Sequence, residues 1–105
     1  MSVRTHTTNV GSLRTGDVIP EGFAGFQVHT IQPEHDSAGG CVTLTLYSLQ
    51  TGARMDWTHQ HPTRPVEIVH PDDHGKPIPP DVERAAVMAR GAARKAAHHA
   101  RRMAR

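Results

Sequence analysis

The segment Cys41-Val42-Thr43-Leu44-Thr45-Leu46-Tyr47-Ser48-Leu49 carries the clearest structural signal in the chain. Val42, Leu44 and Leu46 alternate with residues 41, 43, 45 and 47, so that one face is aliphatic. β-Branched and aromatic residues on a period of two are typical of a half-buried strand. We therefore expect a strand over residues 41–49, with Val42, Leu44 and Leu46 on its buried face.

Similar patterns flank this segment on both sides. Strands are expected over residues 25–32, 53–59 and 66–69, with Phe26 and Trp57 in the core, and Leu13 and Val18 can enter it from residues 10–19. Glycine-rich turns separate these segments, and no helical pattern lies among them. The sequence thus predicts a mainly β protein: a small five-stranded antiparallel barrel over residues 10–70, followed by a C-terminal α-helix. Residues 1–9 form either an edge strand or a loose arm.

The composition of the 105 residues limits the size of the core. Apolar residues make up 36% of the chain, and twelve of these 38 are alanine. Of the other 26, nineteen lie between Val10 and Val69, which fits one small domain and excludes a multi-domain enzyme. No segment is long and apolar enough for a membrane span or a secretory signal. The single cysteine, Cys41, fits a reducing compartment, so we expect a cytoplasmic protein that does not bind membranes.

Charge divides the chain into two parts. Residues 1–80 carry five basic and eight acidic groups (5 − 8 = −3), and residues 81–105 carry seven basic and two acidic groups (7 − 2 = +5). Residues 71–80 are rich in proline and are predicted to be an extended linker that includes the acidic pair Asp72-Asp73. Asp81 is the expected N-cap of a helix over residues 81–105, with alanines on one side and cations on the other.

A basic helix of this kind can contact phosphates through its cations, with strong salt dependence and without base readout. The candidate nucleic-acid-binding residues are Arg84, Arg90, Arg94, Lys95, Arg101, Arg102 and Arg105. Its thin apolar stripe disfavours binding to lipid. The same helix could instead pair with a second copy through its alanine face, or contact an acidic protein surface, its own body included.

Catalytic and metal-binding motifs find little support in the sequence. His59 and His61 could share a strand face, and His70 and His74 lie nearby, but surface histidines are the favoured interpretation and no metal is predicted. The chain has no nucleophile elbow, phosphate loop or dinucleotide fingerprint. We therefore expect neither a cofactor nor an enzymatic activity. Among the aromatic residues, an exposed Tyr47 near Phe23 could stack on a base.

Several segments resemble a KOW-type motif within an SH3-like barrel. They are Gly16-Asp17-Val18-Ile19, Gly22-Phe23-Ala24-Gly25-Phe26, Val28, Ile31, the Val-x-Leu-x-Leu run at 42–46, Gly52 and Val66-Glu67-Ile68-Val69. Pro20 interrupts the first strand of that pattern. The chain also looks like uncharacterised small barrels of actinobacterial phages and plasmids. Because KOW-type barrels usually contact RNA, ribosomes or polymerases, the resemblance implies a binding role.

Two functions remain open from the sequence. The first is a nucleic-acid-binding or nucleoprotein-associated accessory module that uses residues 81–105 as an electrostatic arm. The alternative is a phage or plasmid protein that does not bind nucleic acid and acts as a protein-interaction adaptor or as an inhibitor of a host protein.

Overall fold

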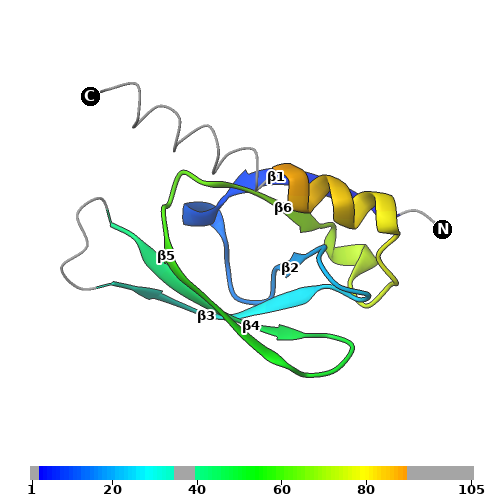
Figure 1. The fold of residues 1–105 in the computed structure, drawn as a ribbon, viewed down its shortest axis with the longest axis horizontal. Helices are drawn as coiled ribbons and strands as arrows, with labels where there is room; N and C mark the ends of the chain where they lie inside the picture. The colour runs from blue at the N-terminus through cyan, green and yellow to red at the C-terminus, as the bar shows by residue number, and fades with distance from the viewer. Residues whose placement is uncertain (1–2, 35–39, 90–105) are drawn as a thin grey trace.

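The computed structural model describes residues 3–34 and 40–89, which form a mainly β fold with one helix (Figure 1). The helix covers residues 80–89 of the described chain. The strands are β1 (Thr5–Asn9), β2 (Val18–Ile19), β3 (Phe26–Pro33), β4 (Val42–Ser48), β5 (Arg54–Gln60) and β6 (Pro65–Val69), with 3-10 helices η1 (Val10–Ser12) and η2 (Pro71–Asp73). The mainly β class and a helix after the strands are thus confirmed.

The strands form two antiparallel sheets. One sheet has the order β2-β3-β4-β5 and is strongly curled, and the other is the pair β1-β6 (Figure 1). Between them lies the main core, in which Val66 of β6 packs with residues of the curled sheet and of the segment after β1. The buried members of this cluster are Val10, Leu13, Ile19, Val28, Leu44, Leu46, Trp57 and Val66.

Leu44 and Leu46 are fully buried in β4, as the alternation in residues 41–49 predicts, and Trp57 of the neighbouring strand is 8% exposed. The alternation does not hold throughout, because Cys41 and Thr45, expected on the other face, are also buried and Val42 is only partly buried. The register of β3 with β4 shifts between Val28 and Thr30, which marks a β-bulge. Because residues 28 and 31 would face opposite sides of a regular strand, this bulge explains how Val28 is buried while Ile31 also packs against the core.

Residues 71–80 do not form the expected extended linker. Pro71–Asp73 is a 3-10 helix, and Ile78 is only 5% exposed in a second core cluster with Val3, Val18 and Val69. The amide of Ile78 also donates a hydrogen bond to the carbonyl oxygen of Phe23, at 2.7 Å. Apolar contacts and main-chain bonding therefore hold this proline-rich segment against the domain, which a reading of proline content alone does not anticipate.

The N-cap of the helix lies two residues earlier than the sequence suggested. The amide of Glu83 bonds to the carbonyl oxygen of Pro79, so Pro79 occupies the cap position and Pro80 is the first helical residue. Proline suits this position, since its fixed φ is helical and its missing N–H would have no partner within the helix. Asp81 is therefore not the N-cap and lies in the first turn, where its charge complements the helix dipole.

Of the two alternatives for residues 1–9, the structure shows the edge strand. β1 pairs with β6 in antiparallel register, from Thr5 opposite Val69 to Asn9 opposite Pro65. Val3, which precedes β1, is 7% exposed and belongs to the second cluster. The folded unit therefore begins before residue 10 and extends beyond residue 70.

Candidate functional site

Arg84 is the one member of the candidate nucleic-acid-binding set that lies within the described residues. It is exposed on the helix over residues 80–89, whereas Ala86 on the same helix is 5% exposed and Val82 packs against the second cluster. Arg84 lies two residues from each of these, which is about 200° around a helix. Packing of Val82 and Ala86 therefore turns Arg84 toward solvent. The other candidates, Arg90, Arg94, Lys95, Arg101, Arg102 and Arg105, lie outside the described residues.

A further contact fixes the first turn of this helix on the domain. The Glu83 carboxylate accepts a hydrogen bond from the amide of Gly22, at 3.1 Å, and Gly22 belongs to the loop between β2 and β3. The helix thus joins the domain through polar and apolar contacts together. Arg84 is presented at a defined position as a result.

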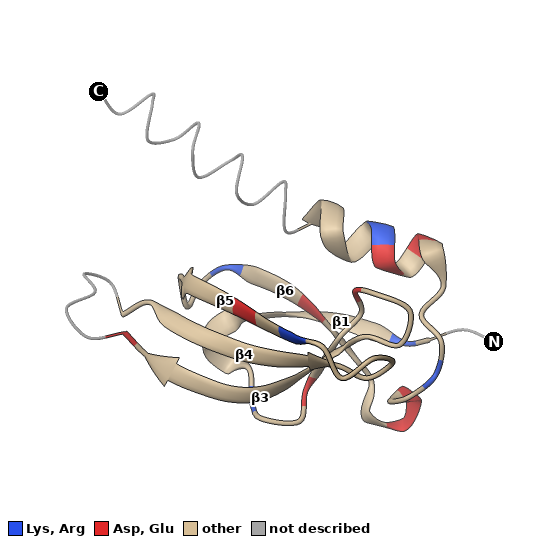
Figure 2. Cartoon of the chain, turned by 60° about the horizontal axis from the view of Figure 1, so that its bottom comes forward, with Lys and Arg blue, Asp and Glu red and all other residues tan. Residues whose placement is uncertain are grey.

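Figure 2 marks where the Lys and Arg residues (blue) and the Asp and Glu residues (red) lie along the described chain, and several cations of the β domain form ion pairs with carboxylates. Arg4 and Lys76 both contact Asp73, and Arg54 Nε lies 3.1 Å from Asp56 Oδ1. The guanidinium beside Asp56 lowers the pKa of that carboxyl group, and Asp56 in turn raises the pKa of Arg54. These ion pairs neutralise positive charge within the domain. The segment after the β domain is therefore the favoured source of a basic surface.

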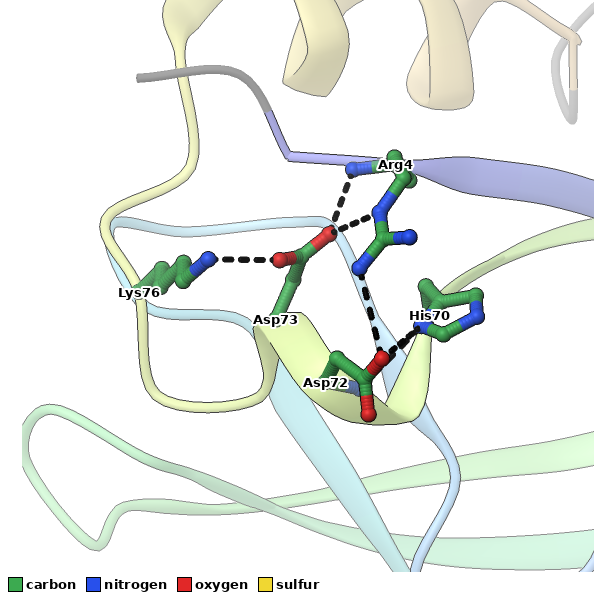
Figure 3. A network of polar contacts seen from close by, with 5 residues as sticks. All are labelled: Arg4, His70, Asp72, Asp73 and Lys76. Atoms are coloured by element: carbon green, nitrogen blue, oxygen red, sulfur yellow. Dashed lines mark hydrogen bonds and ion pairs between the residues drawn. The ribbon is translucent and has the colours of Figure 1, made fainter.

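The densest polar network joins the start of β1 to η2 and consists of Arg4, His70, Asp72, Asp73 and Lys76 (Figure 3). Asp73 is its centre and is only 2% exposed. It accepts hydrogen bonds from Lys76 Nζ at 2.7 Å, from the Arg4 amide at 2.9 Å and from Arg4 Nε at 3.1 Å. The hydrogen bond from Lys76, followed by those from Arg4, holds the pKa of Asp73 well below its usual range.

This network has a structural role in the described chain. It connects Arg4 and Asp73, which are 69 positions apart in sequence. The charged donors also satisfy the hydrogen-bonding capacity of the buried Asp73 carboxylate, which would otherwise be costly to bury. His70 caps η2, because its Nδ1 accepts from the amide of Asp72 at 3.2 Å. From the sequence, Asp73 was expected to lie in an extended linker. Its contact with Arg4 was not predictable, because the two residues are 69 positions apart and share no local pattern.

A second polar site lies at the β-bulge between β4 and β5. The register shifts between Val42 and Leu44, and His59 on β5 has a positive φ of 56°, which is uncommon for a residue other than glycine. Glu34 Oε1 accepts from the His59 amide at 2.7 Å, and Glu34 Oε2 lies 3.0 Å from His59 Nδ1. These contacts hold the bulge, whose positive φ costs backbone strain.

The same carboxylate accepts a hydrogen bond from Thr43 Oγ1, at 2.8 Å. The side-chain bond from His59 and that from Thr43 lower the pKa of Glu34. His61, which the sequence grouped with His59, bonds instead to Thr63 through its Nδ1. Among residues 3–34 and 40–89, no group of three or more His, Cys, Asp or Glu side chains is arranged to hold a metal ion.

An apolar groove of about 350 Å³ is present beside the second cluster. Its lining comprises Val3, Phe23, Lys76, Pro77, Ile78, Pro79 and Pro80. Phe23 is 58% exposed there, which is unusual for a large apolar side chain. The groove was not expected from the sequence, because the proline content of residues 77–80 indicates a linker; the one local signal for it is Ile78, an isolated apolar residue among the prolines.

Tyr47 and Phe23, considered together for base stacking, have different neighbours in the structure. The ring of Tyr47 packs edge-on against His29, with ring centroids 5.1 Å apart and an angle of 86° between the planes. Phe23 belongs to the apolar groove. These contacts give the two aromatic residues separate surroundings.

Comparisons with known proteins give no relative from which a function could be inferred. No protein-family model matches the chain, and no match is found among curated proteins or solved structures. In the described part of the chain, no helix has the length and apolar character that crossing a membrane would need. The function must therefore be argued from the residues themselves.

Proposed function

We propose that this chain is a small nucleic-acid-binding or nucleoprotein-associated accessory module whose basic C-terminal segment contacts phosphates. The observation that carries the proposal is the charge division: residues 1–80 have a formal charge of −3, and residues 81–105 have +5. Residues 90–105 contain six Lys or Arg residues and no Asp or Glu. Such a segment gains affinity for polyanions by releasing their condensed counterions.

The docked helix supports this proposal in a specific way. Contacts of Val82, Glu83 and Ala86 attach residues 80–89 to the β domain, while Arg84 stays exposed. The cationic residues after position 89 therefore follow directly from a fixed point on the domain. The domain would position the partner, and the segment would supply the electrostatic attraction.

The finer fold assignment belongs to the same proposal. We propose that the curled sheet and the β1-β6 pair are a variant of the SH3-like barrel with a KOW-type opening. The order of the strands and the Gly16-Asp17 turn before β2 support this, as do contacts between β2 and β6 that bring the two sheets together. On this assignment the resemblance to KOW-type barrels supports a binding role by analogy.

Binding to a labelled duplex and to a labelled single strand, measured by fluorescence anisotropy over a range of salt, tests the proposal. The test variant replaces the six cations of residues 90–105 with glutamine, which leaves the helix contacts of Val82 and Ala86 in place. Binding should weaken steeply with salt, with a slope near −0.9 per phosphate contacted on a duplex. The variant should lose most of this slope.

A body cation provides the matched control. Arg54→Gln removes one charge that is paired with Asp56, so the salt slope should stay within error of the unchanged chain. Absence of binding at low salt to both nucleic acids would refute the proposal. Equal slopes for the full chain and the six-glutamine variant would also refute it, because the bound surface would then lie elsewhere.

The exposed Phe23 supports the second candidate, a protein-interaction adaptor or inhibitor. Exposed aromatic residues next to a groove are common in protein interfaces, where large rings act as anchors. A chain that binds no nucleic acid at low salt, yet retains a protein partner in a manner that Phe23→Ser abolishes, would favour this candidate over the first.

A further inference from the structure

The outer edge of strand β1 is a main-chain surface without a neighbouring strand in the described chain. β1 lies at the end of the two-stranded sheet and, among residues 3–34 and 40–89, pairs with β6 alone. The amide of Val10 bonds to the Arg64 carbonyl, and the amide of His70 bonds to the Arg4 carbonyl. In both pairs the residue numbers sum to 74, as they do throughout the pairing of β1 with β6, so residues 4 and 10 are in the same register as β1. Bonded and non-bonded pairs alternate in an antiparallel ladder, so the even-numbered residues of β1 form the hydrogen-bonded pairs with β6.

It follows that the odd-numbered residues Thr5, Thr7 and Asn9 direct their main-chain N–H and C=O groups away from β6. Pro65 of β6 agrees with this register, since it lies opposite Asn9 at a position where no amide is needed for pairing. Thr5, Thr7 and Asn9 are exposed. The outer side of β1 therefore presents three donors and three acceptors at regular spacing.

Edge strands usually carry features that prevent such pairing, and β5 illustrates them. β5 bears the charged residues Arg54 and Asp56, a register shift, and the positive φ of His59 near its end. β1 is Thr-His-Thr-Thr-Asn, with no Lys, Arg, Asp, Glu or Pro and no register shift against β6. Of these two edges, the one at β1 is regular and uncharged, as addition of a strand requires.

We propose that two copies of this chain associate through their β1 strands, antiparallel about a two-fold axis at Thr7. In this register Thr7 faces the partner's Thr7, and Thr5 faces the partner's Asn9. All three outward-facing residues then form bonded pairs, with two main-chain hydrogen bonds for each of three pairs. The two remaining pairs, related by the two-fold axis, place His6 opposite the partner's Thr8 and Thr8 opposite the partner's His6.

The sequence of β1 favours a second copy as the occupant. The two-fold pairing brings no like charges together, and it pairs threonine with threonine at the axis, which is a favourable cross-strand combination. A shift by two residues in either direction would leave part of the edge unpaired. The side chain of Thr7 already donates to the carboxylate of Glu67 on β6, which fixes it at this position.

The helix lies beside the same strand and is consistent with this assembly. A groove between them is lined by Thr5 and Glu67 of the sheet and by Asp81, Val82, Ala85 and Ala86 of the helix. Val87 and Met88 on this helix are exposed, at 42% and 65%. A two-fold axis through the continuous sheet would place both helices on one face of it, and the dimer would thus present two copies of the C-terminal segment from the same face. The pairing itself does not depend on nucleic-acid binding.

Sedimentation equilibrium of the full chain, without nucleic acid, tests the pairing. The unchanged chain should show a reversible monomer–dimer equilibrium. Thr7→Pro removes the outward amide at the two-fold axis, on the side of β1 that β6 does not use, and should weaken the dimer roughly tenfold or more. Thr7→Val keeps the amide and the branched shape and loses only the hydroxyl contacts, so its dimer should be weakened by no more than about fivefold.

Disulfide formation tests the register in a second way, which does not depend on the folding of the proline variant. In a Cys41→Ala background, Thr7→Cys should cross-link to a covalent dimer, because bonded antiparallel pairs have Cα atoms about 5.5 Å apart, within disulfide range. Thr5→Cys should not, since the partner's Thr5 would lie four residues along the strand, roughly 13 Å away.

Three results would overturn the proposal. The first is a chain that remains monomeric at roughly millimolar concentration. The second is a dimer that a folded Thr7→Pro variant forms with unchanged affinity, which would place the contact elsewhere, for example on the alanine face of the helix. The third is equal cross-linking of the Thr5→Cys and Thr7→Cys variants, which would indicate random collision.

Discussion

Replacing Ile78 with alanine measures how much the proline-rich segment contributes to the folded domain. Ile78 is 5% exposed and packs with Val3, Val18 and Val69, which come from the N-terminus and from strands β2 and β6. A flexible linker would tolerate this change. A docked segment would not, because the substitution removes apolar contacts between elements distant in sequence.

The expected cost follows from the atoms removed. Isoleucine to alanine deletes three carbon atoms, and about 0.8 kcal/mol for each buried methylene gives about 2.4 kcal/mol. A residual cavity adds to this value, although Ile78 also lines the open groove, where the site can relax. We expect a loss of about 2–3 kcal/mol in the free energy of unfolding. For a domain of this size that corresponds to a fall of roughly 10–20 °C in Tm.

Urea unfolding followed by the fluorescence of Trp57, the one tryptophan of the chain, measures this loss. Trp57 belongs to the main core, so a change in its transition reports on the whole domain. Met88→Ala is the matched control, because Met88 is 65% exposed on the helix that follows, and its effect should stay within about 0.5 kcal/mol. If Ile78→Ala also stays within that limit, the reasoning is wrong and the segment behaves as a linker.

Two further predictions concern stability. Gly25→Ala should lower the free energy of unfolding by about 2–5 kcal/mol, because φ is +89° there and a Cβ would lie 2.6 Å from Val18 Cγ1. Gly52 also has a positive φ, of +74°, but its Cβ would meet open space, so Gly52→Ala should cost only about 1–2 kcal/mol. Thermal or urea unfolding measures both losses. Equal losses would contradict the packing argument. The lowered pKa of Asp73 stabilises the folded state above the ordinary aspartate pKa, and this contribution is lost as the pH falls toward the folded-state pKa. The urea midpoint of Asp73→Asn should therefore lie below that of the unchanged chain at about pH 7, and the difference should narrow at about pH 3; a difference independent of pH would contradict the assignment.

The strand pattern is the part of the fold that the sequence predicts best. β3, β4, β5 and β6 lie within one or two residues of the segments expected from alternation and turns. This agreement has a local cause, because each strand shows its buried face in its own residues. For the candidate phosphate-binding residues, the structure adds the exposure of Arg84 and the attachment of residues 80–89 to the domain; binding itself stays a prediction.

The network of Arg4, Asp73 and Lys76 was not predictable in the same way. Arg4 and Asp73 are 69 positions apart, and the proline content around Asp73 indicated an extended segment. Similarly, Glu34 and His59 meet only because β5 has a bulge with a positive φ at His59. A bulge depends on how two strands are matched, and neither strand encodes it alone.

The amino-acid sequence by itself therefore determined the mainly β class, most strand positions and the concentration of positive charge after residue 80. Each of these follows from neighbouring residues, whose periodicity and charge can be read along the chain. The tertiary structure decided which polar groups are buried, that residues 71–80 belong to the folded unit, and that no strand of the described residues lies on one side of β1. These properties depend on contacts between segments far apart in sequence, where burial and hydrogen bonding arise only once the two sheets and the helix have packed together.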